Sequence, residues 1–118
     1  MIKIKQVGKK AVHLILNIDG ARLLLSRMNL PGDITIRLDE SSLKITKGTV
    51  IDLKIIINDE DDRISFLGTT FVLELDSDTL EYFRKRLEDC LNGGDFSPAE
   101  LCEASFGSLV ISMYAILI

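Results

Sequence analysis

The chain has 118 residues, a formal net charge of -4 and an apolar fraction of 47%. That length predicts one compact domain covering residues 1–118. Ile, Leu and Val contribute 38 residues, which excludes a disordered tail. No apolar run approaches the length that spans a bilayer, and the N-terminus lacks the hydrophobic segment of a secretory signal. We therefore expect a cytoplasmic protein with no membrane partner.

Alternating apolar residues predict strands along most of the chain, separated by short turn signals. This pattern is typical of an antiparallel meander, and no internal repeat is evident. Asp19-Gly20 predicts a hairpin turn, which makes residues 21–28 a strand, although the same stretch also fits a helix. The predicted strands begin at Ile2 and then occupy residues 13–18, 34–38, 43–46, 50–57, 63–67 and 69–75.

Helical periodicity first appears after Ser77. Asp78 fits an N-cap, with Glu81 three residues later as the second half of a capping box. Glu81 is also placed to pair with Lys85 one turn further on. The main amphipathic helix is therefore expected at about residues 78–91, and its apolar stripe consists of Leu80, Phe83, Leu87 and Leu91.

A second capping pattern follows at Ser97, Pro98 and Glu100. It predicts a short second helix at about residues 98–104, followed by a C-terminal strand that returns to the sheet. The expected fold class is α+β: a mostly antiparallel meander with one main helix, one short helix and a closing strand.

Chemistry-bearing residues are few. His13 is the only histidine and has no acidic or cysteine neighbour in sequence, so a packed or surface-facing strand position is expected. Cys90 and Cys102 could pair in principle, but in a chain this rich in aliphatic residues we expect two reduced, buried thiols. Neither a zinc pattern nor a phosphate-binding glycine loop is present. The sequence predicts no enzyme, cofactor or metal.

Charge is distributed unevenly along the chain. Residues 1–54 contain ten Lys or Arg and five Asp or Glu, a balance of +5, whereas residues 55–118 contain four and thirteen, a balance of -9. In the basic half, lysines such as Lys9 and Lys10 could touch phosphates, but no aromatic residues are interleaved with them. We therefore expect no nucleic-acid partner.

The densest charge lies in one inter-strand loop. Such a loop either keeps the protein soluble as a solvated turn or attracts a basic protein partner. Carboxylates at the start of the predicted helix could extend it, although they also suit the helix dipole. The candidate partner-binding residues are Asp59, Glu60, Asp61, Asp62, Asp76 and Asp78.

Residues 68–80 (GTTFVLELDSDTL) run from a strand into the main helix, and a closing strand follows. This pattern, with the small size and acidity, resembles the small bacterial immunity proteins of polymorphic and contact-dependent toxin systems. The resemblance implies a cytoplasmic inhibitor that binds one cognate basic toxin domain, commonly a nuclease, in a stoichiometric complex.

The apolar C-terminus supports a different class of function. Residues 110–118 are almost continuously apolar, which is typical of a strand buried on both faces or covered by a partner. The alternative to an inhibitor is a structural module that forms a homodimer through this strand.

Overall fold

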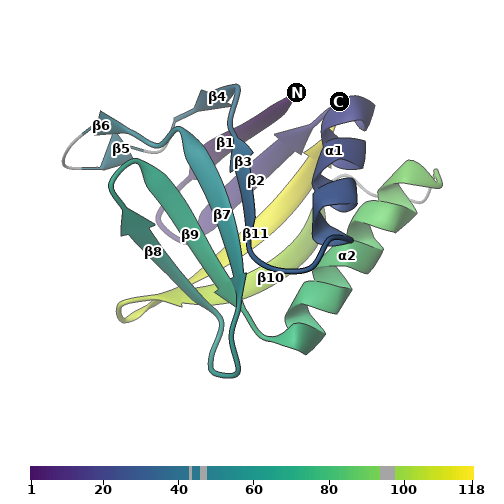
Figure 1. Cartoon of the computed structure of the whole chain (residues 1–118). Coiled ribbons are helices and arrows are strands. Elements are labelled where there is room, and N and C mark those ends of the chain that lie inside the picture. The colour runs from purple at the N-terminus through teal and green to yellow at the C-terminus, as the bar shows by residue number, and fades with distance from the viewer. Residues whose placement is uncertain (43, 46–47, 94–97) are drawn as a thin grey trace.

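The structure is a computed structural model that describes residues 1–42, 44–45, 48–93 and 98–118. It is an α+β fold with two helices and a nine-stranded sheet, accompanied by a small two-stranded hairpin (Figure 1). The elements are β1 (Ile2–Val7), β2 (Ala11–Leu16), α1 (Ile18–Met28), β3 (Ile34–Arg37), β4 (Glu40–Ser41), β5 (Lys44–Ile45), β6 (Gly48–Thr49), β7 (Asp52–Ile57), β8 (Arg63–Leu67), β9 (Thr70–Leu75), α2 (Ser77–Leu91), β10 (Ala99–Phe106) and β11 (Leu109–Leu117).

The α+β class is confirmed, but the large sheet is mixed, so the expected mostly antiparallel meander is confirmed only in part. Its strand order is β3-β7-β9-β8-β10-β11-β2-β1-β4. β9 pairs with β7 and β11 pairs with β2 in parallel, and neither pair consists of strands that are consecutive in the chain. The four hairpin pairs β1–β2, β3–β7, β8–β9 and β10–β11 are antiparallel.

The sheet closes on itself through one bent segment. β3 and β4 stand at opposite ends of the strand order, yet only Leu38 and Asp39 separate them in the chain. The Leu38 N–H donates to the carbonyl of Ile51 at 2.9 Å, whereas the Asp39 N–H donates to the carbonyl of Ile2 at 2.8 Å. The bent segment therefore bonds to both ends of the sheet and joins them.

The closed sheet is built from an internal structural repeat, which the sequence did not reveal. Repeat 1 (residues 2–57) runs β1–β2–α1–β3–β7, and repeat 2 (residues 63–117) runs β8–β9–α2–β10–β11. β2 pairs with β11 over six parallel register positions, and β9 pairs with β7 over six positions in the same way. β4, β5 and β6 are an insertion between the last two strands of repeat 1.

Equivalent positions of the two repeats build one apolar core. The two helices lie side by side on one side of the molecule (Figure 1). They contribute buried side chains to the same cluster as the strands, so burial of apolar surface joins helices and sheet. Equivalent buried pairs are Leu14 with Leu73, Leu16 with Leu75, Leu24 with Phe83, and Met28 with Leu87.

The main predicted helix is confirmed as α2, with Phe83 and Leu87 buried in the core. The other helix lies elsewhere than expected. Residues 21–28 belong to α1, an 11-residue helix, and not to a strand. Asp19-Gly20 lies in its first turn, where Gly20 is needed because a Cβ there would overlap the backbone carbonyl of Met1.

Residues 98–104 do not form the predicted second helix. Residues 99–106 are β10, which pairs with β11 along its length with a register shift between Glu100 and Cys102. Two-residue alternation, with Cys102 and Ala104 buried and Glu103 exposed, replaces the helical period. Pairing with β11 outweighs the local capping pattern, whose first residue, Ser97, lies outside the described residues.

The C-terminal strand is present as β11, but its setting differs from the dimer hypothesis. β10 pairs with one edge of β11 and β2 pairs with the other. The middle of this strand therefore has no free edge for a second copy, because residues 112–115 are paired on both sides with strands of their own chain.

Candidate protein-binding site

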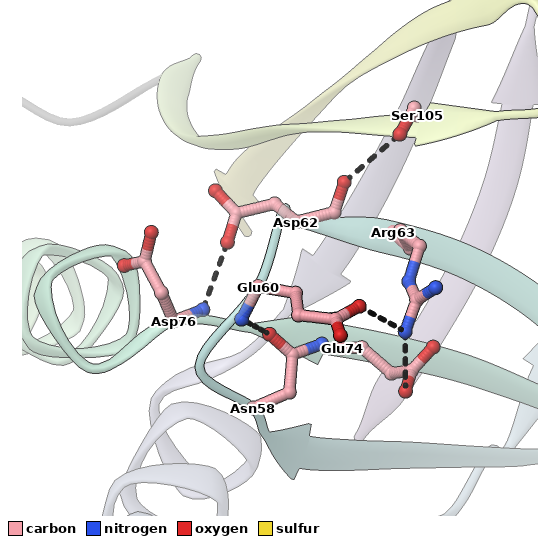
Figure 2. A network of polar contacts seen from close by, with 7 residues as sticks. All are labelled: Asn58, Glu60, Asp62, Arg63, Glu74, Asp76 and Ser105. Atoms are coloured by element: carbon pink, nitrogen blue, oxygen red, sulfur yellow. Dashed lines mark hydrogen bonds and ion pairs between the residues drawn. The ribbon is translucent and has the colours of Figure 1, made fainter.

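The acidic loop, residues 58–62, joins β7 to β8 beside the N-terminus of α2 (Figure 2). It is also the link between the two repeats. Repeat 1 contains the whole charge balance of +5, since residues 55–57 are uncharged, and the rest of the chain contains the balance of -9. The separation of charge along the sequence is thus a separation between structural repeats.

Asp62 anchors the acidic loop. Its carboxylate accepts the Asp76 N–H at 2.9 Å and the Thr79 hydroxyl at 2.8 Å (Figure 2 shows the first). Its carbonyl accepts the backbone N–H of Ser105 at 2.9 Å and the Ser105 hydroxyl at 3.1 Å. This one residue therefore ties the loop to the start of α2 and to β10, so its role is structural.

Asp76 also has a structural role. It precedes α2, and its Oδ1 accepts the Thr79 N–H at 2.7 Å, as an N-cap does. That hydrogen bond is the main reason that the pKa of Asp76 lies below its ordinary value. Asp78, which the sequence predicted as the cap, is exposed in the first turn of the helix.

The middle of the loop is shaped by Asn58 and Arg63. The side-chain oxygen of Asn58 accepts the Glu60 N–H at 2.9 Å, which turns the chain. The Arg63 guanidinium lies 3.6 Å from the Glu60 carboxylate and 3.5 Å from that of Glu74 (Figure 2). Arg63 thereby offsets part of the negative charge of the loop.

Asp59 and Asp61 are the unpaired carboxylates of the loop. Both residues are exposed, and the described residues provide neither side chain with a hydrogen bond or ion pair. Glu60 is exposed beside them, with 74% of its side chain accessible. The structure therefore separates the candidate residues into three that face solvent in the loop, two that hold it in place, and Asp78, exposed on α2.

Cys102 is unsuited to nucleophilic or metal chemistry. Its side chain is buried in the core, and burial raises the pKa of its thiol to about 12, helped by the carboxylates of Asp62, Glu100 and Glu103. The expectation of a buried, reduced thiol is confirmed for Cys102. The side chain of Cys90 lies outside what the structure describes.

His13 packs on the outer surface of the sheet. It is half-buried on β2, and its ring contacts the ring of Tyr114 on β11 edge to face, with centroids 5.9 Å apart. This is the packed strand position that the sequence predicted. Elsewhere, the described residues contain no cluster of three or more His, Cys, Asp or Glu side chains suited to a metal ion.

One pocket of about 180 Å³ lies where β4 meets β1. Lys3, Lys5, Ser41 and Ser42 contribute to its lining, but Lys3 already pairs with Glu40 at 2.8 Å. The Lys3–Glu40 ion pair thus lies at this pocket, whose lining contains neither imidazole nor thiol.

Neither α1 nor α2, the helices of the described segments, combines the length and the apolar character that crossing a membrane requires.

Comparisons with protein-family models and with curated proteins give no match for this chain.

Proposed function

We propose that this chain is a protein-binding inhibitor that neutralises a cognate bacterial toxin by stoichiometric binding. The observation that carries the proposal is the construction of the acidic loop. Asp62 fixes the loop to α2 and β10, while Asp59, Glu60 and Asp61 remain exposed beside that anchor. A loop whose backbone is anchored in this way loses less conformational entropy on binding than a free loop, so it suits a basic protein surface.

Charge distribution supports a basic partner. The acidic loop belongs to the half of the chain with a balance of -9, and only Arg63 among the described residues forms an ion pair with it. A field of one sign speeds the approach of an oppositely charged protein and weakens with added salt. Basic toxin domains, commonly nucleases, have the surface chemistry that such a loop would bind.

The test is affinity capture with a matched pair of variants. The tagged chain captures proteins from an extract of its source cell, and the Asp59→Lys/Asp61→Lys variant is compared with Asp33→Lys/Asp89→Lys. Both variants replace two exposed Asp residues, so their net-charge change is equal. We expect one basic protein to be captured in stoichiometric amount, lost with the first variant and retained with the second.

Equal capture by both variants would contradict the loop assignment. Asp62 is left unchanged because its loss would leave the Asp76 N–H and the Thr79 hydroxyl without an acceptor. The captured protein is then expressed in a test cell with and without this chain. Growth arrest that the chain relieves would support the inhibitor, whereas a harmless partner would refute the toxin part of the proposal.

A further inference from the structure

The two repeats differ in one parallel strand pairing: the pairing at the outer edge of β1 and the equivalent pairing at the edge of β8. β4 runs parallel to β1 over two register pairs, and β10 runs parallel to β8 at one pair, Arg63 with Ser105. The other two parallel pairings, β2 with β11 and β7 with β9, each extend over six residue pairs. The parallel pairings of β1 and β8 are therefore the short ones.

In repeat 1 the chain covers the remaining edge of β1 itself. The Ser42 N–H donates to the carbonyl of Ile4 at 3.0 Å, and the Ser42 hydroxyl oxygen accepts the Gln6 N–H at 3.1 Å. Both bonds come from the insertion that contains β4. An extended segment running beside β1 is thus part of this fold.

Repeat 2 lacks such an insertion. After Ser105, β10 turns into β11 through Gly107, whose φ of 59° suits the turn. The groups equivalent to those that Ser42 satisfies are the carbonyl of Ile64 and the N–H of Phe66. The described part of the chain places no strand beside them, since β8 pairs with β10 only at Arg63.

The surroundings of this edge are apolar at one end, and the acidic loop lies beyond the other end, past the pairing of Arg63 with Ser105. Leu67, at the end of β8, is 71% exposed, and Phe106 and Val110 are exposed on the neighbouring hairpin. The Phe106 ring contacts the Phe66 ring edge to face, with centroids 5.5 Å apart. The acidic loop directly precedes β8 at the opposite end.

We propose that the free edge of β8, residues 64–67, binds an extended basic segment of a partner protein as an added strand. Backbone hydrogen bonds would occupy the Ile64 carbonyl and the Phe66 N–H, as Ser42 does in repeat 1. Lys or Arg residues of the segment face the acidic loop, and an apolar side chain contacts Leu67 and Phe106. This inference rests on the proposed function and adds how the partner is held.

Charge argues against a second copy of the chain as the occupant. An antiparallel pair of β8 strands would place each acidic loop beyond Gly68 of the other copy, and residues 67–72 contain no basic residue. The lysines of the chain are concentrated in repeat 1, whose equivalent edge is already covered. A basic segment from another protein therefore fits the edge better.

The test uses a capped peptide, Lys-Lys-Val-Thr-Val-Thr-Val-Lys-Lys, added to the isotope-labelled full chain. Amide signals of residues 59–61 and 64–67 are expected to shift, and exchange of the Phe66 amide hydrogen should slow by at least about tenfold. The control is the same peptide with alternate backbone nitrogens methylated, which cannot pair as a strand. Shifts without Phe66 protection, or no binding at about 1 mM, would overturn the inference.

Two variants separate this inference from the proposed function. Leu67→Lys adds a positive charge at the edge and should weaken peptide binding by about fivefold or more, whereas Leu30→Lys, a change at another exposed leucine, should not. If Asp59→Lys/Asp61→Lys weakens binding and Leu67→Lys does not, the edge is refuted and the acidic loop is retained. The reverse pattern supports the edge and refutes the loop assignment.

Discussion

Neighbouring carboxylates of the acidic loop have different roles. Asp61 is exposed and unpaired within the described residues, whereas the carboxylate of Asp62 accepts two hydrogen bonds that tie the loop to α2. Their immediate sequence is a run of acids, so local sequence does not distinguish them. The difference arises from Thr79 and Ser105, which are distant in the chain and reach Asp62 only after folding.

The pH dependence of folding stability in a conservative variant of Asp76 tests the hydrogen bond that caps α2. Because the pKa of Asp76 is lowered in the folded state, protons bind the unfolded state more tightly, and stability falls as pH drops through the folded pKa. Asp76→Asn retains a cap of the kind that Asn17 provides for α1, with its side chain 2.8 Å from the Gly20 N–H. We expect little change at neutral pH and a shallower loss of stability below about pH 5, measured by thermal unfolding.

Asp59→Asn is the control for that series, because its exposed carboxylate has no side-chain partner in the described part of the chain. Its stability should follow the wild-type pH profile. If Asp76→Asn also follows the wild-type profile, the hydrogen bond to Thr79 does not account for the lowered pKa.

At the level of elements, two local signals were overridden by contacts from elsewhere in the chain. The Asp19-Gly20 pair is typical of a hairpin, but Asn17 caps a helix there and the N-terminus crosses its first turn. Residues 97–100 are typical of a helix start, but β10 gains strand pairing with β11. A motif of two to four residues contributes less free energy than a whole strand ladder, so tertiary pairing prevails.

Gly20→Ala tests why a glycine opens α1. Alanine favours helices by about 1 kcal/mol over glycine, but here its Cβ would overlap the Met1 backbone carbonyl, which no rotamer change can relieve. We expect a net destabilisation of about 1–3 kcal/mol in urea unfolding. Ser26→Ala, at an exposed position of the same helix, should be neutral or slightly stabilising. A stabilising Gly20→Ala would contradict the close approach of the N-terminus.

At the scale of the molecule, two equivalent repeats close one sheet, and each has its own charge sign. The equivalent buried side chains of the two helices differ in type, as Leu24 and Phe83 do, so the repeat leaves no obvious signal in the sequence. The repeats do share a pattern: an N-cap follows the second strand in both, at Asn17 and Asp76. These two caps are the signal in the sequence: an alignment of the two halves of the chain on Asn17 and Asp76 would have revealed the repeat.

A circular permutant tests the equivalence of the repeats. The Met1 amino group lies 2.8 Å from the Asn17 side-chain oxygen, and the Ile118 N–H donates to the Leu16 carbonyl, so the termini meet at the end of β2. Joining them by a short glycine-serine linker and opening the chain between Glu60 and Asp61 exchanges the order of the repeats. We expect a folded protein whose unfolding midpoint lies within about 10 °C of the wild type.

The matched control is the same linked chain opened between Arg84 and Lys85, inside α2. It should lose cooperative unfolding, because that helix contributes Phe83 and Leu87 to the core. An unfolded loop-opened permutant, or two equally stable permutants, would contradict the view of two repeats joined by the acidic loop.

The sequence by itself determined the strands with clear two-residue alternation, such as β3, and the main helix α2. It also placed Asp59, Glu60 and Asp61 in an exposed loop between two strands. These features depend on periodicity and composition within a short stretch. Closure of the sheet, the strand at residues 99–106 and the anchoring by Asp62 and Asp76 were decided by the tertiary structure. Each of these depends on hydrogen bonds or packing between segments far apart in the chain, and no local pattern encodes which segments will meet.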